Sequence, residues 1–419
     1  MSLLWPGEER AGDLFSEAAY LAAMVRVEEA WLAATVSSGI APEEAGTPLA
    51  GLVSDDDVPG LAEGSEAGGN PVIGLVKLLR GRLDGEPARW LHKGLTSQDV
   101  VDTALVLCLR DVLDRVEEEL AAQAGSLIGL ARDHRATVMS GRTLSQHAVP
   151  ITFGLKASTW LSGLTDAAEA LRRARISLPA QIGGAAGTLA AVVGLARLRG
   201  VTDPVGAART AAATTAATLE LAPRTPWHTT RAPLTAAADA LVAAADIWGR
   251  IATDITLLTR PEIGELAEPA GEGRGGSSTM PHKSNPVLSV LIRRHALAAP
   301  PLAATLHAAA ASYVDERPDG AWHAEWETLA TLARRSVVAA SQTTELLAGL
   351  RVDVARMRAT AEAAGADLLA EQRSLTGFVG GDVLAGTDAA SSLDDYLGAA
   401  DALIDSTISR ARDTWDHLV

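Results

Sequence analysis

A seven-residue repeat of large apolar side chains constrains the fold of this 419-residue chain more than any other feature. Leu234, Leu241, Trp248 and Ile255 fall seven positions apart, and an alanine follows each of the first three after four residues. A repeat of this period over several turns predicts a long α-helix in a left-handed bundle. Because the segment is apolar around much of its circumference, we expect other helices to bury it, both from its own subunit and from neighbouring subunits.

The rest of the chain also shows helical patterns rather than strand alternation or short repeats. Beyond Val352 the segments become shorter and are separated by Gly380-Gly381 and Gly386, which predicts a small C-terminal domain. The fold should therefore be almost entirely α-helical. Further segments with helical spacing are residues 14–36, 105–120 and 286–314, and a stretch that ends near residue 350.

Composition and charge exclude several classes of protein. With 47% apolar and 21% charged residues, the chain can bury a large core, and its net charge of −16 argues against nucleic-acid binding. The first ten residues lack the apolar core of a signal peptide, and aspartates interrupt the most apolar helical segments. The single cysteine, Cys108, fits a reducing compartment and reads as a buried apolar residue rather than a catalytic thiol. We expect a cytoplasmic protein without membrane or nucleic-acid partners.

The loop from Gly275 to Pro286 holds the densest set of reactive side chains. Its sequence is Gly-Gly-Ser-Ser-Thr-Met-Pro-His-Lys-Ser-Asn-Pro. A serine near the Lys283 cation and the Asn285 amide suits removal of a proton next to a carboxylate, because the dianionic intermediate needs such donors. A phosphate-binding Walker loop would need glycine directly before the lysine, where His282 stands. A solvated linker remains the second alternative on the residues alone.

A second polar segment precedes one of the predicted helices. Thr96, Ser97 or Asp99 could cap that helix. Hydroxyls at a helix start, beside its exposed N–H groups, also form a carboxylate site. His92 and Lys93 stand next to them and favour the second interpretation, but the residues alone leave both open.

A third polar segment runs from Gly141 to Pro150. Arg142 could bind a carboxylate through paired hydrogen bonds. His147 could titrate near neutral pH, although a structural histidine fits the pattern equally well. Two further irregular stretches, the glycine-rich 181–188 and the polar 226–231, interrupt the helical pattern without a specific signal of their own.

The loop sequence Ser277-Ser278-Thr279-Met280-Pro281, with Lys283, Asn285 and Pro286, resembles the signature loop of the fumarase/aspartase superfamily. This resemblance implies that Ser277 is the general base and that Lys283 and Asn285 hold a substrate carboxylate. The superfamily's first signature region is similar to His92, Gly94 and residues 96–99, and its second to residues 141–143 with Gln146 and Pro150.

The resemblance also implies an architecture. Such proteins have three helical domains, which correspond here to residues 1–98, 99–350 and 351–419. The long helices of the central domain assemble four subunits around one helical core. Each active site then takes its three signature regions from three different chains, so we expect a homotetramer with shared sites.

Within the superfamily, the chain is most similar to bacterial 3-carboxy-cis,cis-muconate cycloisomerases. The most specific likeness is Gly320-Ala-Trp-His-Ala-Glu-Trp326, supported by Gln146-His147 and by Trp227-His228-Thr229 with Arg231. Three positions depart from that group, which usually has Trp, Gln and Asp where this chain has Lys93, Thr230 and Ala232. These departures bear on the identity of the substrate.

The reaction implied is addition of a carboxylate oxygen across a double bond of a muconate tricarboxylate, without a metal or redox cofactor. Ser277, His147 and Lys283 are then the expected catalytic residues. The expected substrate-binding residues are His92, Lys93, Thr96, Ser97, Arg142, Gln146, Arg231, Ser278, Met280 and Asn285. One alternative is a lyase that releases fumarate from a succinyl adduct such as adenylosuccinate or nitrosuccinate. Another is a helical scaffold without catalysis, which the intact set of loop residues disfavours.

Overall fold

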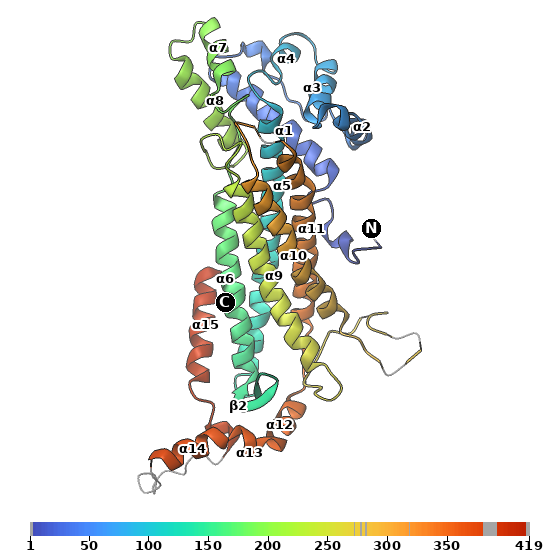
Figure 1. The fold of residues 1–419 in the computed structure, drawn as a ribbon, viewed down its shortest axis with the longest axis vertical. Coiled ribbons are helices and arrows are strands. Elements are labelled where there is room, and N and C mark those ends of the chain that lie inside the picture. Colours follow the sequence, from blue (N-terminus) through green and yellow to red (C-terminus); the bar gives the residue numbers. More distant parts are fainter. Residues whose placement is uncertain are drawn as a thin grey trace. The chain divides into compact units, whose positions relative to one another are not determined.

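The structure is a computed structural model that describes residues 3–271, 273–276, 279–280, 283–317, 319–379 and 392–415. The chain divides into two compact units. The first comprises residues 1–115, 171–242 and 299–338, and the second comprises residues 116–170, 243–298 and 339–419. Helices dominate both units (Figure 1), which confirms the predicted helical fold. The three-domain division at residues 98 and 350 stays a prediction.

The longest described helices carry the predicted apolar repeats. They are α5 (Ser97–Asp133), α6 (Phe153–Ile176), α9 (Ala232–Leu258), α10 (Val287–Ala311) and α11 (Gly320–Ala348). The seven-residue repeat lies on α9, and all four of its large side chains and the three intervening alanines are buried. The sequence period therefore identified a helix enclosed by its neighbours.

The first unit contains parts of the long helices α5, α9 and α11, together with several shorter helices. Helix α1 packs against α8, α7 against α8, and α2 against α3. A small cluster of buried apolar residues (Leu32, Ala41 and Ala45) joins α1 to the segment after it. The shorter helices of this unit are α1 (Glu17–Ser37), α2 (Val58–Gly68), α3 (Val72–Gly81), α4 (Gly85–Trp90), α7 (Ala190–Leu198) and α8 (Pro204–Thr218), with 3-10 turns at Glu8–Ala11, Glu43–Ala45 and Asp55–Asp57.

In the second unit, hydrogen bonds between buried side chains connect the long helices. Trp248 on α9 donates to Gln123 on α5 (2.8 Å), and Gln123 donates to the carbonyl of Ala340 on α11 (2.9 Å). The Trp160 indole on α6 donates to Asp254 on α9 (3.0 Å). Each bond satisfies a polar group that burial would otherwise leave unpaired.

The second unit also contains two small antiparallel sheets that the sequence patterns did not predict. Strands β1 (Val138–Thr143) and β2 (Gln146–Thr152) form a hairpin, and β3 (Leu266–Ala267) pairs with β4 (Arg351–Val352). Helix α12 packs against β1 and α13 against β2, and Figure 1 shows α15 beside α6, where Arg410 forms ion pairs with Asp166 and Glu169. The last helices are α12 (Val354–Ala363), α13 (Gly365–Leu368), α14 (Ala370–Val379) and α15 (Ala400–Thr414), with a 3-10 turn at Leu393–Asp395.

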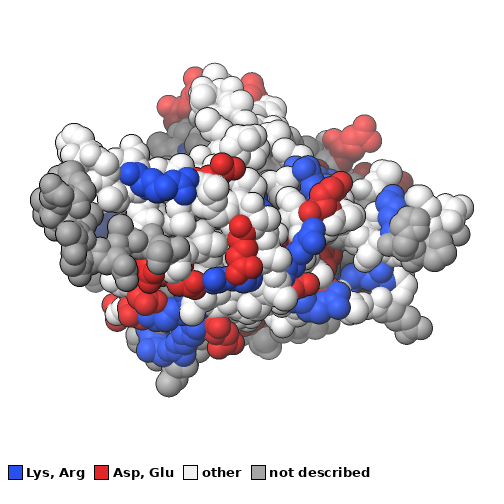
Figure 2. Space-filling view, turned by 90° about the horizontal axis from the view of Figure 1, so that it is seen from below, with Lys and Arg blue, Asp and Glu red and all other residues white. Residues whose placement is uncertain are grey.

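The surface carries both signs of charge despite the acidic composition. Figure 2 shows basic and acidic side chains interspersed on one face, with uncharged areas between them. On this face, positive charge is therefore local to particular lysines and arginines. Among the helices that the structure describes, none is long and apolar enough to cross a membrane.

Cys108 should be inert towards thiol reagents in the folded protein. Cys108 belongs to α5, and its side chain is only 3% exposed. This burial raises the pKa of the thiol to about 12. Only roughly one thiol in ten thousand is then ionised at pH 8, and the thiolate is the reactive form. We expect the folded protein to resist labelling by N-ethylmaleimide at pH 8 and the urea-unfolded protein to label completely. Mass spectrometry distinguishes the two, and rapid stoichiometric labelling of the folded protein would contradict the buried position.

Candidate active site

The start of helix α5, in the first unit, presents two hydroxyl groups, those of Thr96 and Ser97. Thr96 precedes the helix and Ser97 is its first residue, and both are partly exposed. Within the described residues, neither hydroxyl has a hydrogen-bond partner. They stand where the unpaired N–H groups and the dipole of a 37-residue helix favour an anion. This end of α5 is therefore suited to bind a carboxylate.

Asp99, rather than either hydroxyl, accepts the hydrogen bonds that fix this helix start. Its buried carboxylate accepts hydrogen bonds from the backbone N–H of Thr96 (3.0 Å) and from those of Gly183 and Gly184 (both 2.9 Å). The side-chain amide of Gln181 donates a further bond (3.1 Å). The glycine-rich stretch at 181–188 thus holds the start of α5 in place, so that the two hydroxyls need not act as caps.

His92 has a buried carboxylate as its partner. Its Nδ1 lies 2.6 Å from Oε1 of Glu28, which is fully buried on α1. The backbone of His92 adopts a left-handed conformation (φ 62°), which costs energy for a residue other than glycine and is maintained by the surrounding contacts. The Trp31 indole fixes the same turn by donating to the carbonyl of Lys93 (2.8 Å), while the Lys93 side chain is exposed. His92 and Lys93 therefore stand on a rigid turn directly before Thr96.

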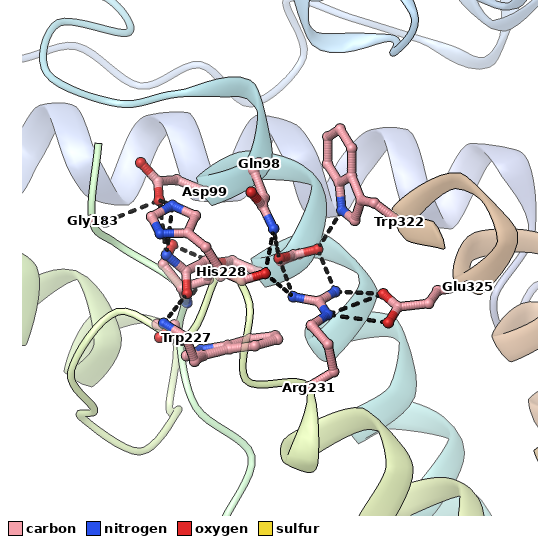
Figure 3. A network of polar contacts seen from close by, with 12 residues as sticks. Gln98, Asp99, Gly183, Trp227, His228, Arg231, Trp322 and Glu325 are labelled. Atoms are coloured by element: carbon pink, nitrogen blue, oxygen red, sulfur yellow. Dashed lines mark hydrogen bonds and ion pairs between the residues drawn. The ribbon is translucent and has the colours of Figure 1, made fainter. Parts of the chain in front are cut away.

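Arg231 is not in a position to bind substrate, and the prediction for this residue is corrected. Its guanidinium is fully buried between Asp102 (2.6 and 2.9 Å) and Glu325 (2.6 Å), as Figure 3 shows. The Trp322 indole also donates to Asp102 (2.9 Å). Burial alone would lower the pKa of Arg231, but the two carboxylates outweigh it and raise the pKa well above its ordinary value. The arginine holds α5, α11 and the segment before α9 together.

In the second unit, the β1–β2 hairpin carries Arg142, Gln146 and His147. Arg142 and His147 are opposite each other across the strands, and Gln146 and His147 are exposed. Arg142 forms a bidentate ion pair with the fully buried Glu265 (2.8 and 3.2 Å). The hairpin thus holds a guanidinium and an imidazole side by side.

The signature loop is closed at its base by one residue. Asn285 donates to the carbonyl of Gly275 from both its backbone N–H (2.9 Å) and its side-chain amide (3.0 Å). Gly275 has a left-handed backbone (φ 71°), and a Cβ there would lie 2.6 Å from the carbonyl oxygen of Asn285, so only glycine fits. Lys283 is exposed and Met280 is 41% exposed. The predicted base Ser277 and its neighbour Ser278 lie outside the described residues.

The structure groups the predicted residues in three places. The start of α5 has His92, Lys93, Thr96 and Ser97, the hairpin has Arg142, Gln146 and His147, and the loop has Met280, Lys283 and Asn285. Within the part of the chain that the structure describes, no hydrogen bond or ion pair joins the hairpin residues to Lys283 or Asn285, and no cluster of His, Cys, Asp and Glu has the geometry of a metal site.

Sequence reasoning missed the buried partners of these residues. Glu28 and Asp102 could have been noticed, because each stands on an apolar stripe at helical spacing, with Met24 and Leu32 around the first and Leu105 after the second. An acidic residue in such a stripe needs a partner inside the protein. Glu265, by contrast, stands in an irregular segment that has no periodicity to mark it as buried.

The chain has clear relatives among known proteins. A family model described as lyase matches residues 62–299. A nitrosuccinate lyase from Streptomyces davaonensis is 44% identical over 365 residues, which cover 85% of this chain and 76% of that protein. A 3-carboxy-cis,cis-muconate cycloisomerase from Bradyrhizobium diazoefficiens is 42% identical over 354 residues, covering 83% and 76% of the two chains. The crystal structure of 3-carboxy-cis,cis-muconate lactonizing enzyme from Pseudomonas putida matches with a TM-score of 0.84 and 33% identity, over 96% of this chain and 97% of that one.

Replacement of Arg231 should destabilise the protein strongly. Arg231→Met would leave the carboxylates of Asp102 and Glu325 buried without their counter-charge, which costs about 3–5 kcal/mol in comparable sites. We expect a lower midpoint of urea unfolding, followed by circular dichroism. The control is Arg199→Met, which removes an exposed arginine after α7 and should leave the midpoint unchanged. Equal midpoints for both variants would contradict the assigned role of Arg231.

Proposed function

Because the chain is an enzyme of the fumarase/aspartase superfamily and belongs to its lyase family, we propose that it adds or removes a group at the carbon β to a substrate carboxylate. The first candidate reaction is lactonisation of 3-carboxy-cis,cis-muconate. A carboxylate oxygen of the substrate forms a bond to one alkene carbon, and the neighbouring carbon, next to a carboxylate, gains a proton. In the reverse direction that proton is removed, and the carbon–oxygen bond breaks.

The observation that supports this proposal most is the pair of unpaired hydroxyls at the start of α5. A substrate carboxylate bound by Thr96 and Ser97 would lie at a helix N-terminus, three residues along the chain from the exposed Lys93. Charge that develops on a carboxylate during proton removal is stabilised by fixed donors of this kind, and loss of one such donor costs about 3–4 kcal/mol of transition-state energy in comparable sites. The proposed roles of Ser277 as the base and of Lys283 and Asn285 as further donors follow from the superfamily resemblance.

We further propose that the working enzyme is a homotetramer in which three chains contribute to each site. The start of α5 would come from one chain, the hairpin from a second and the loop from a third. The tip of the hairpin is suited to a contact with another chain, because Leu144 is 97% exposed there. Leu144 and Ser145 form the turn and both have left-handed backbones (φ 48° and 67°). A contact between chains at this tip would remove the Leu144 side chain from water, which is favourable.

A second candidate reaction is release of fumarate and nitrite from nitrosuccinate. The 44% identity to a nitrosuccinate lyase supports it, and so do the three positions that depart from the cycloisomerase pattern. Lys93, Thr230 and Ala232 are all exposed, so they are free to contact a substrate. Both reactions transfer a proton at a carbon next to a carboxylate, and they differ in the group that is added or released at the neighbouring carbon.

An ultraviolet assay distinguishes the two candidates. The purified enzyme should consume the conjugated diene of 3-carboxy-cis,cis-muconate, and Ser277→Ala should reduce kcat at least about a hundredfold because the group that transfers the proton at carbon is lost. Formation of fumarate from nitrosuccinate without diene loss would instead establish the second reaction. Full activity of Ser277→Ala on the accepted substrate would exclude Ser277 as the base.

Sedimentation velocity tests the assembly. At micromolar concentration we expect a species of four chains, the assembly that the superfamily resemblance implies. A monomer or dimer could not form the proposed site, because that site needs three chains. Leu144→Asp places a charge at the hairpin tip, where a contact between chains would have to bury it, and should shift the equilibrium towards smaller species. Leu198→Asp is the control, since Leu198 is similarly exposed (86%) at the end of α7. A monomeric wild-type enzyme with full activity would refute the shared site.

A further inference from the structure

The β1–β2 hairpin contains an irregularity next to its functional residues. Ser140 is paired with Pro150 and Arg142 with His147, so two residues of β2 stand opposite the single Gly141. This is a β-bulge, which re-aims nearby side chains. A Cβ on Gly141 would lie 2.6 Å from the carbonyl oxygen of Val149, so the bulge requires glycine at this position.

The bulge brings Ser140 into contact with His147. The Ser140 Oγ lies 2.5 Å from Nδ1 of His147, and Ser140 is 1% exposed. Its hydroxyl has one hydrogen, and the only other acceptor that it contacts among the described residues is the carbonyl of Gly141, at 3.4 Å. That distance exceeds the usual range for an O–H···O hydrogen bond, so the hydrogen is best placed towards Nδ1.

This arrangement determines which nitrogen of the imidazole carries the hydrogen. A neutral imidazole has one N–H and one bare nitrogen. If Nδ1 accepts from Ser140, the hydrogen is on Nε2, and the exposed side of His147 offers a donor. Arg142, directly opposite, uses three of the five N–H groups of its guanidinium for Ser140 and Glu265, which leaves two donors. Both side chains therefore present N–H groups to a ligand.

We infer that Ser140 is a positioning residue that fixes His147 as a hydrogen-bond donor, so that His147 and Arg142 together grip a substrate carboxylate. This inference rests on the proposed function and decides between the two roles open to His147. The imidazole binds substrate and does not accept the proton that is removed from carbon. A ligand with only acceptor oxygens on one end, a carboxylate or a nitro group, matches this surface.

Steady-state kinetics test the inference on whichever substrate the enzyme accepts. We expect Ser140→Ala to raise KM about tenfold and to change kcat less than about twofold, since a binding contact is weakened. Ser140→Thr keeps the hydroxyl and should restore KM. Ser126→Ala removes an exposed hydroxyl on α5 and serves as the control. A large fall in kcat in Ser140→Ala with KM unchanged would show that His147 transfers protons, and no change in either would show that Ser140 does not position it.

A double-mutant cycle separates positioning from simple packing. His147→Gln replaces the imidazole N–H by an amide N–H, so Ser140→Ala should have no further effect on KM in that background. If Ser140 only packed the hairpin, its replacement would have the same effect in both backgrounds, and the inference would fail.

Magic-angle-spinning nitrogen NMR gives a readout that does not need activity. In protein labelled with 15N-histidine at about pH 9, where neutral imidazole predominates, the His147 signals are those that His147→Gln removes. We expect hydrogen on Nε2 in the wild type and a mixture of both tautomers in Ser140→Ala. Hydrogen on Nδ1 in the wild type would overturn the inference even if the enzyme is active. An enzyme inactive on both substrates would overturn the proposed function while this spectrum still tests Ser140.

Discussion

A buried guanidinium between two carboxylates holds the first unit together. Removing Arg231, Asp102 and Glu325 from water is costly, and their mutual hydrogen bonds, with those that Trp322 and Gln98 donate to Asp102, offset that cost. The three residues belong to α5, α11 and the segment before α9, so the ion pairs connect parts of the chain that are far apart in sequence. Figure 3 shows that the network continues through Gln98 and His228 to Asp99. The start of α5, with its two unpaired hydroxyls, is thereby fixed before any ligand arrives.

Buried side chains hold exposed or partly exposed side chains in place in both units. Glu28 holds His92, Glu265 holds Arg142, and Ser140 holds His147, and each of these supporting residues is buried. An exposed side chain that is already fixed by a hydrogen bond to a buried residue loses little conformational entropy when it binds a ligand. At the start of α10 the half-buried Glu268 accepts from the backbone N–H groups of Leu288 and Ser289, directly after the signature loop.

Much of the fold and part of the site could be predicted from the sequence, for identifiable physical reasons. The repeat on α9 could be recognised because a helix that packs against neighbours along its whole length needs an apolar side chain at each packed position. The spacing of those side chains is visible directly in the sequence. The hydroxyls at 96 and 97 were visible as a helix start, although Asp99, and not either hydroxyl, is bonded there. Arg231 was misassigned because an arginine in a polar segment gives no sign that two acidic residues, 129 positions before it and 94 after it, enclose it. Ser140 gave no signal either, since its contact depends on a bulge that changes strand register, which periodicity does not report.

The closed base of the signature loop has a consequence for how this enzyme can change. Because Gly275 and Asn285 meet directly, the helices on either side do not depend on the length of chain between them. The entropy of closing a loop grows only with the logarithm of its length, at about 0.6 kcal/mol for each doubling. Insertions and deletions between these two residues are therefore expected to cost little stability, so that the loop can change in length while the helices on either side stay as they are.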